Sequence, residues 1–156
     1  MTKTIVLAVD TTSHVASAAE VAADLAARTG DRVIVLHVHE FAVGRFGRIQ
    51  VDCAENEGEH VADDIVRRLR DAGVSAIAEI RKTPVGHIAR TIMATVEEVG
   101  AWMIILGSTS THDVPRLPFG SVSLRLLHMS DKPVLIVPRS QAAPVVPEPA
   151  AATAAS

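Results

Sequence analysis

Residues 107–122 read Gly-Ser-Thr-Ser-Thr-His-Asp-Val-Pro-Arg-Leu-Pro-Phe-Gly-Ser-Val. The apolar run at 102–106 before this stretch predicts a buried strand, and the helical pattern at 122–129 after it predicts a helix that begins near Gly120. A helix N-terminus presents unpaired N–H groups with a partial positive charge, and glycines let the backbone approach a phosphate closely. The stretch therefore indicates either an anion-binding loop or an ordinary strand-to-helix loop whose glycines only permit the turns.

Apolar runs and amphipathic patterns alternate along the whole chain. Continuous apolar runs are typical of strands buried on both faces, and apolar residues every three or four positions are typical of helices. Gly30 is a predicted helix stop, and residues 40–51, which contain Gly44 and Gly47, look like an exposed loop. The predicted strands cover residues 4–9, 33–38, 74–80, 102–106 and 134–137, and the predicted helices cover residues 15–26, 52–72, 85–99 and 122–129.

This alternation of strands and helices predicts the fold class. Strand–helix–strand units form right-handed crossovers, which give a mostly parallel sheet with helices on both faces. Ligands of such sheets bind beyond the carboxyl ends of the strands, at the point where the strand order reverses.

Composition narrows the classes of function. The 156 residues suffice for one domain with a sizeable core, and the net charge of -3 gives no basic surface for nucleic acid. The single cysteine, Cys53, excludes an internal disulfide. No apolar run reaches the roughly 18 residues of a membrane helix, and the N-terminal run is too short for a secretory signal. We expect a soluble cytoplasmic protein with a domain at 1–140 and a disordered Ala/Pro-rich tail at 141–156.

The loop has the spacing of a known family motif. Gly107-x2-Ser110-x9-Gly120-Ser121 resembles the nucleotide loop of the universal stress protein family, Gly-x2-Gly-x9-Gly-(Ser/Thr), and residues 120–138 are similar to that family's C-terminal signature. The run Ile5-Val-Leu-Ala-Val-Asp10 resembles its first strand. The resemblance implies a Rossmann-like three-layer α/β/α sandwich with a five-stranded parallel sheet in the order 3-2-1-4-5. The reversal then lies between the first and fourth strands, which places Asp10 beside Gly107.

The resemblance also implies site residues. Asp10 matches the family's adenosine-recognising aspartate, although by itself it is equally suited to capping the first helix. Val38 matches a position that lines the adenine, although a strand valine most simply packs in the core. The positions on the phosphate side are Gly107, Ser110, Gly120, Ser121, Val122 and Ser123, the last of which is placed to donate from the first helical turn.

Two positions depart from the family pattern. Ser110 stands where nucleotide-binding members carry glycine, so it strains the loop, crowds the ligand or adds a hydroxyl donor. Pro115 and Pro118 stiffen the same loop, which either pre-organises a site or locks it shut. Trp102 stands where the family commonly has aspartate, and a lone tryptophan is typical of packing or of an interface.

Other candidate chemistries are poorly supported. His37 and His39 share a face of one strand, but structural zinc sites need four ligands, so we expect no metal there. The chain has neither the Gly-Lys-(Ser/Thr) of a P-loop nor a Gly-x-Gly-x-x-Gly after the first strand. No general base is evident, so we expect catalysis to be slow or absent.

Three functional hypotheses follow. The first is a stress or signalling protein that binds an adenine nucleotide, with ATP as the leading ligand, AMP or ADP as alternatives, and Mg2+ as a companion ion. The second is a nucleotide-free dimeric interaction protein of the same fold, whose site Ser110 and the two loop prolines have closed. The third keeps the nucleotide site and adds slow ATP hydrolysis. The resemblance also implies a homodimer through the last strand, residues 134–138, whose apolar edge is a liability when it is left unpaired.

Overall fold

The computed structural model describes residues 1–11, 15–44, 47–50, 55–108 and 120–138. The predicted tail at 141–156 and most of the loop between residues 107 and 120 lie outside these ranges. Among the described residues, no helix is both long enough and apolar enough to cross a bilayer.

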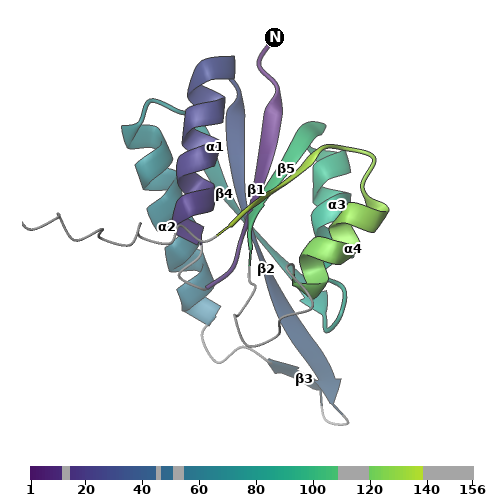
Figure 1. Ribbon diagram of the computed structural model, residues 1–156. Helices are drawn as coiled ribbons and strands as arrows, with labels where there is room; N and C mark the ends of the chain where they lie inside the picture. Colours follow the sequence, from purple (N-terminus) through teal and green to yellow (C-terminus); the bar gives the residue numbers. More distant parts are fainter. Residues whose placement is uncertain (12–14, 45–46, 51–54, 109–119, 139–156) are drawn as a thin grey trace, which may run out of the picture.

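Five parallel strands form the centre of the domain (Figure 1). Their order is β4-β2-β1-β5-β6, which confirms the order 3-2-1-4-5 expected from the resemblance. The central strand is paired on both sides, since Val6 lies opposite Ile34 of β2 and Ile104 of β5. The bounds are β1 Thr4–Val9, β2 Arg32–Gly44, β4 Ala76–Pro84, β5 Ala101–Gly107 and β6 Val134–Val137.

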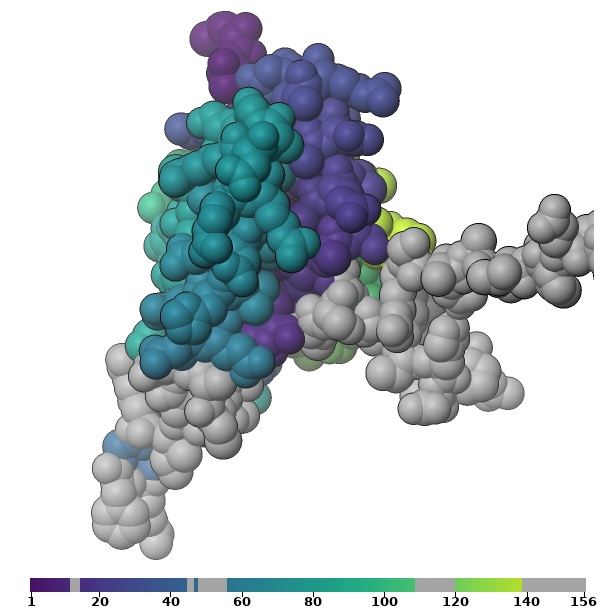
Figure 2. Space-filling model, turned by 90° about the vertical axis from the view of Figure 1, so that its left-hand side faces the viewer, coloured from purple at the N-terminus to yellow at the C-terminus, as the bar shows by residue number. Residues whose placement is uncertain are grey.

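Within the described ranges, four helices cover the two faces of this sheet. In Figure 1, α1 and α2 lie on one side, and α3 and α4 lie on the other. Figure 2 views the first side, where α1 and α2 lie next to each other. Gly30, at φ 71°, follows the end of α1 as expected, because glycine adopts this conformation without a steric penalty. The bounds are α1 Val15–Thr29, α2 Glu55–Asp71, α3 Ile88–Glu98 and α4 Ser121–Met129.

The strands divide their side chains between two apolar clusters. Along β2, Val33 and Val35 pack with α1 and α2, whereas Ile34 and Leu36 pack with α3 and α4. The alternation arises because successive side chains of a strand point to opposite faces. All four of these side chains are buried, which explains why the sequence shows a continuous apolar run.

The expectation of a loop at residues 40–51 is wrong. β2 continues to Gly44, and an additional short strand, β3 Gly47–Gln50, pairs antiparallel with its end. β2 persists because β4 runs beside it as far as the pair Phe41–Pro84, so its backbone groups keep strand partners. Gly44 and Gly47, whose presence suggested a loop, face each other as a pair in this hairpin.

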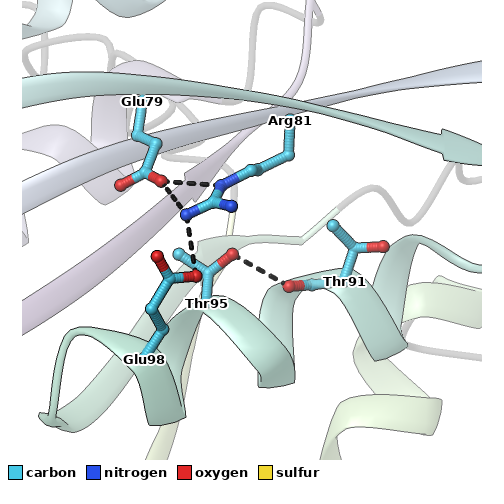
Figure 3. A network of polar contacts seen from close by, with 5 residues as sticks. All are labelled: Glu79, Arg81, Thr91, Thr95 and Glu98. Atoms are coloured by element: carbon cyan, nitrogen blue, oxygen red, sulfur yellow. Dashed lines mark hydrogen bonds and ion pairs between the residues drawn. The ribbon is translucent and has the colours of Figure 1, made fainter.

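Polar contacts join α3 to the edge strand β4 (Figure 3). The Arg81 guanidinium binds the carboxylates of Glu79, on the same strand, and Glu98, at the end of α3. On α3 itself, the Thr95 hydroxyl donates to the Thr91 carbonyl at 3.0 Å. The Thr91 and Thr83 hydroxyl oxygens lie 2.9 Å apart, so polar groups join α3 to β4 at two places, whereas the side of α3 that faces β5 is apolar.

Candidate functional site

A cavity of about 190 Å³ lies at the carboxyl ends of the central strands. Its walls come from the ends of β1 and β5, from the middle of β2, and from the starts of α1, α3 and α4. This is the point where the strand order reverses, because the chain leaves β1 toward β2 on one side and reaches β5 on the other. The lining residues are Ala8, Val9, Asp10, Val15, Leu36, His37, Val38, Ile88, Ile92, Leu106, Gly107, Ser121, Val122 and Ser123.

Six of the eight predicted site residues line this one cavity. Asp10 follows the end of β1, is half-buried and lines the cavity. Val38 is 9% exposed and has both of the roles considered for it, since it packs in the core beside α3 and also lines the cavity. Gly107 ends β5 opposite Val137 of β6. Asp10 and Gly107 therefore face one space, as the strand order requires.

The start of α4 forms the opposite wall. Ser121, Val122 and Ser123 line the cavity, and Ser123 is 2% exposed. Gly120 precedes them as the N-cap residue, with no side-chain cap, and its carbonyl accepts the first helical hydrogen bond from Leu124 at 3.1 Å. The Gly120 torsions, φ -65° and ψ 164°, are open to any residue. What glycine supplies at this position is therefore the absence of a side chain at the helix N-terminus.

Ser110 lies outside the described residues, as do Pro115, Arg116 and Pro118. The effect of serine at position 110 therefore stays a prediction. Of the described residues that line the cavity, none is lysine or arginine, and Asp10 is the one carboxylate. Fixed positive charge at this part of the site comes from the backbone dipole of α4.

His37 has a role at the cavity that the sequence did not indicate. Its side chain is 5% exposed, and Nδ1 lies 3.0 Å from the carbonyl oxygen of Val9, the residue before Asp10. A carbonyl only accepts, so Nδ1 carries the proton and donates. Nε2 is buried without a hydrogen-bond partner among the described residues and faces Gly58 of α2, where a Cβ would lie 2.0 Å from it. His37 thus fixes the end of β1 that carries Asp10.

The histidine pair is packed rather than arranged around an ion. The rings of His37 and His39 meet edge to face, with centroids 4.4 Å apart. Across the part of the chain that the structure describes, no group of three or more histidine, cysteine, aspartate or glutamate side chains is placed to hold a metal.

Sequence reasoning also missed the apolar wall on α3. Ile88 and Ile92 line the cavity four residues apart, which places them on one face of the helix. Their spacing in the sequence indicated an amphipathic helix, and packing in the core was a sufficient explanation for its apolar face. Only the position of α3 beside the strand ends shows that the first turns of this face reach the cavity.

The comparison with protein families gives one clear match. The model of the universal stress protein family matches residues 1–138. No curated protein sequence matches the chain. Among solved structures, a protein of the universal stress protein family from Burkholderia pseudomallei is 27% identical, with a TM-score of 0.70. The alignment covers 87% of this chain and 96% of that protein.

Two similar structures contain adenine nucleotides. The universal stress protein from Archaeoglobus fulgidus in complex with dAMP is 22% identical, with a TM-score of 0.66, and the match covers 86% of this chain and 97% of that one. A universal stress protein in complex with cAMP is 21% identical, with a TM-score of 0.64 and coverage of 89% and 98%. At these identities the likeness concerns the fold, and the ligands belong to those two proteins.

Proposed function

This chain belongs to the universal stress protein family, and on that premise we propose that its cavity binds an adenine nucleotide and acts in a stress or signalling response. ATP is the leading ligand, with AMP and ADP as alternatives. One observation carries the proposal: a single cavity gathers Asp10, Val38, Gly107 and the start of α4 from four separate elements. The adenosine part lies by Asp10 and Val38, and the phosphates lie toward Gly107, Ser110 and the helix N-terminus at Gly120.

The binding of nucleotide would act by selecting a conformation. A ligand shifts a protein only by binding one state better than another. Because the described lining of the cavity lacks lysine and arginine, a triphosphate calls for a companion cation. The Ser121 hydroxyl, on the phosphate side, supplies an oxygen atom that Mg2+ accepts beside phosphate oxygens and water, so Ser121 would help to hold it.

Turnover of the nucleotide is proposed to be slow or absent. The titratable side chains that line the described part of the cavity are Asp10 and His37. His37 donates from Nδ1 to Val9, and its Nε2 faces Gly58, so the ring is not placed to activate a water in the cavity. A phosphate-release assay on purified protein with ATP checks this, and steady multiple turnover that Asp10→Asn abolishes would contradict it.

Calorimetric titration of nucleotide-stripped protein with ATP, AMP and GTP tests the binding. We expect micromolar affinity for an adenine nucleotide, weakened about tenfold or more by Asp10→Ala because one hydrogen bond to a charged group is lost. Asp24→Ala, on the exposed surface of α1, is the matched control and leaves the affinity unchanged. No heat with any nucleotide, from folded protein, would contradict the proposal and favour the closed-site interaction protein.

Ser110 decides between an open and a closed site. Ser110→Gly restores the family pattern at the one loop position that departs from it. Gained affinity would identify a site that serine has degraded, and lost affinity would identify a serine that contacts the ligand.

The last strand supports a homodimer, which is the second part of the proposal. β6 lies at the edge of the described sheet, and large apolar side chains are exposed on it and on the neighbouring helix α4. Leu135 is 36% exposed, Leu127 45% and Met129 48%. A second copy pairing along residues 134–138 would cover this surface. Light scattering after size-exclusion chromatography should give the dimer mass, and Leu135→Lys should shift it toward the monomer.

A further inference from the structure

The turn that leads into α3 is held from two sides at one residue. Gly86 lies between the end of β4 and the first residue of α3, Ile88. Its backbone N–H donates to Glu40 Oε1 of β2 at 2.7 Å. Its carbonyl oxygen accepts from Arg125 Nη1 of α4, also at 2.7 Å. One glycine is therefore bonded to two different elements by two charged side chains.

The local sequence leaves this turn dependent on these bonds. Gly86 has φ 84°, a conformation in which any other residue is strained. The N-cap residue of α3, His87, makes no side-chain capping bond. Its ring nitrogen Nδ1 instead lies 3.1 Å from the Val85 carbonyl, and its backbone N–H donates to Pro84. The first turn of α3 is therefore fixed by its neighbours and not by a cap of its own.

The three elements joined at Gly86 are walls of the cavity. Glu40 lies two residues beyond Val38 on β2, Arg125 lies two residues beyond Ser123 on α4, and α3 begins two residues after Gly86. Val38, Ser123 and Ile88 all line the cavity. A shift of the turn would therefore move the Ile88 wall relative to the walls that carry Val38 and Ser123.

We propose that Glu40 and Arg125 are positioning residues, which set the distance between the α3 wall of the cavity and its β2 and α4 walls through their two bonds to Gly86. Neither residue lines the cavity, so each acts through the turn. This inference rests on the proposed function for its effect on ligand, but the effect on the turn stands independently. Its general basis is that binding sites need walls held within a fraction of an ångström.

The variants separate a positioning role from a general loss of stability. Arg125→Met keeps the length of the side chain and removes the donor, and Glu40→Ala removes the acceptor. Arg125→Lys and Glu40→Gln are the conservative partners, since each retains a group that can bond to Gly86. Arg67→Gln is the matched control, because it breaks an exposed ion pair with Asp64 on α2, on the opposite face of the sheet.

The first measurement needs no ligand. Hydrogen–deuterium exchange over residues 84–92 should accelerate about fivefold in Arg125→Met and in Glu40→Ala, the effect of one lost hydrogen bond. The conservative variants and Arg67→Gln should exchange like the wild type. The thermal midpoint of every variant should stay within about 2 °C of the wild-type value. Unchanged exchange in both disrupting variants overturns the proposal.

The second measurement is titration of the same variants with AMP. We expect about fivefold weaker binding for the two disrupting variants and recovery in the conservative ones. Faster exchange with unchanged affinity would overturn the role in positioning the cavity. No heat from the wild type counts against the proposed function and not against the Gly86 bonds, which the exchange measurement then decides by itself.

Discussion

The two ends of the parallel sheet use their polar groups differently. At the amino end, the buried Asp31 carboxylate accepts from the Lys3 backbone N–H and from Trp102 Nε1, each at 2.9 Å. The Lys3 ammonium lies 5.5 Å from the centre of the Trp102 ring. At the carboxyl end, Asp10 and Ser121 instead line a cavity. At the amino end these polar groups hold the chain together, whereas at the carboxyl end some polar groups hold the walls of the cavity and Asp10 and Ser121 border a space that a ligand can fill.

The contrast between the two ends of the sheet gives a role to Trp102, which stands where the family commonly has aspartate. The tryptophan packs against the apolar cluster that α1 and α2 cover, and its N–H reaches a carboxylate on the neighbouring segment. A packing role, as the sequence indicated, is therefore present, together with a hydrogen bond to Asp31. The residue lies at the end of the sheet opposite the cavity, so it belongs to the framework and not to the ligand site.

The largest expected effect tests the packing behind the cavity. Gly58→Ala adds a Cβ that would lie 2.0 Å from His37 Nε2, so α2 or the ring must move. We expect a loss of about 2–3 kcal/mol in the free energy of unfolding, despite the better helix propensity of alanine. Urea unfolding measures it.

Two further variants make this prediction specific. Glu57→Ala, on the exposed side of the same helix, should change stability by less than about 0.5 kcal/mol. The double variant Gly58→Ala with His37→Ala should be less destabilised than the sum of the two single variants, because the clash is gone. Additive effects would show that Gly58 and His37 do not constrain each other.

The next effect tests the amino end. Trp102→Phe keeps the apolar ring but removes the N–H that donates to Asp31 Oδ2. A buried carboxylate with one donor fewer should cost about 1–2 kcal/mol of stability. Nucleotide affinity should stay unchanged, because the cavity lies at the other end of the sheet. Calorimetric titration measures the affinity, and chemical unfolding of the same preparation measures the stability. A large change in affinity would contradict the separation of roles between the two ends of the sheet.

Lowering the pH should reduce the stability that Asp31 contributes at the amino end of the sheet. Burial alone would raise the pKa of Asp31, but hydrogen bonds from Lys3, Thr29 and Trp102 and the Lys3 charge outweigh it and lower that pKa. The stabilisation is therefore complete above the unfolded pKa of about 3.9 and is lost as the pH falls through the lower folded value. Asp31→Asn should be less stable than the wild type at neutral pH, and the difference should narrow below about pH 4. A constant difference from pH 7 to pH 3 would contradict this.

The smallest expected effect is at the Arg81 network (Figure 3). Hydrogen bonds from Arg81 to Glu98 and Glu79 raise the pKa of the guanidinium, but the arginine side chain is 35% exposed and that of Glu98 61%. Water and salt screen such pairs, so Arg81→Met should cost only about 0.5–1 kcal/mol. Repeating the unfolding in high salt should shrink the difference, whereas a buried network such as that of Asp31 should respond less.

Several elements were predictable because one physical signal defined each of them. The strands at 4–9 and 134–137 begin and end in the structure at the residues that the sequence predicted, since both runs are short and continuously apolar. The end of β2 was not predictable from composition. Gly44 and Gly47 suggested a loop, but pairing with β4 and β3 keeps the chain extended. Local propensity is weak there, and one of the backbone partners that override it, β4, lies far away in the sequence.

The sequence by itself determined the fold class, the strand order through its family resemblance, and the residue types at Asp10, Gly107, Gly120 and Ser121. The fold class follows from periodicity, whereas the strand order and the site residues are what the family resemblance implies. Only the tertiary structure decided that His37 and Ile88 line one cavity with Asp10, Gly107 and Ser121, that Asp31 reaches Trp102, and that Glu40 and Arg125 meet at Gly86. The physical reason is that each of these contacts joins separate elements, and the packing of helices on the sheet sets the distances between them.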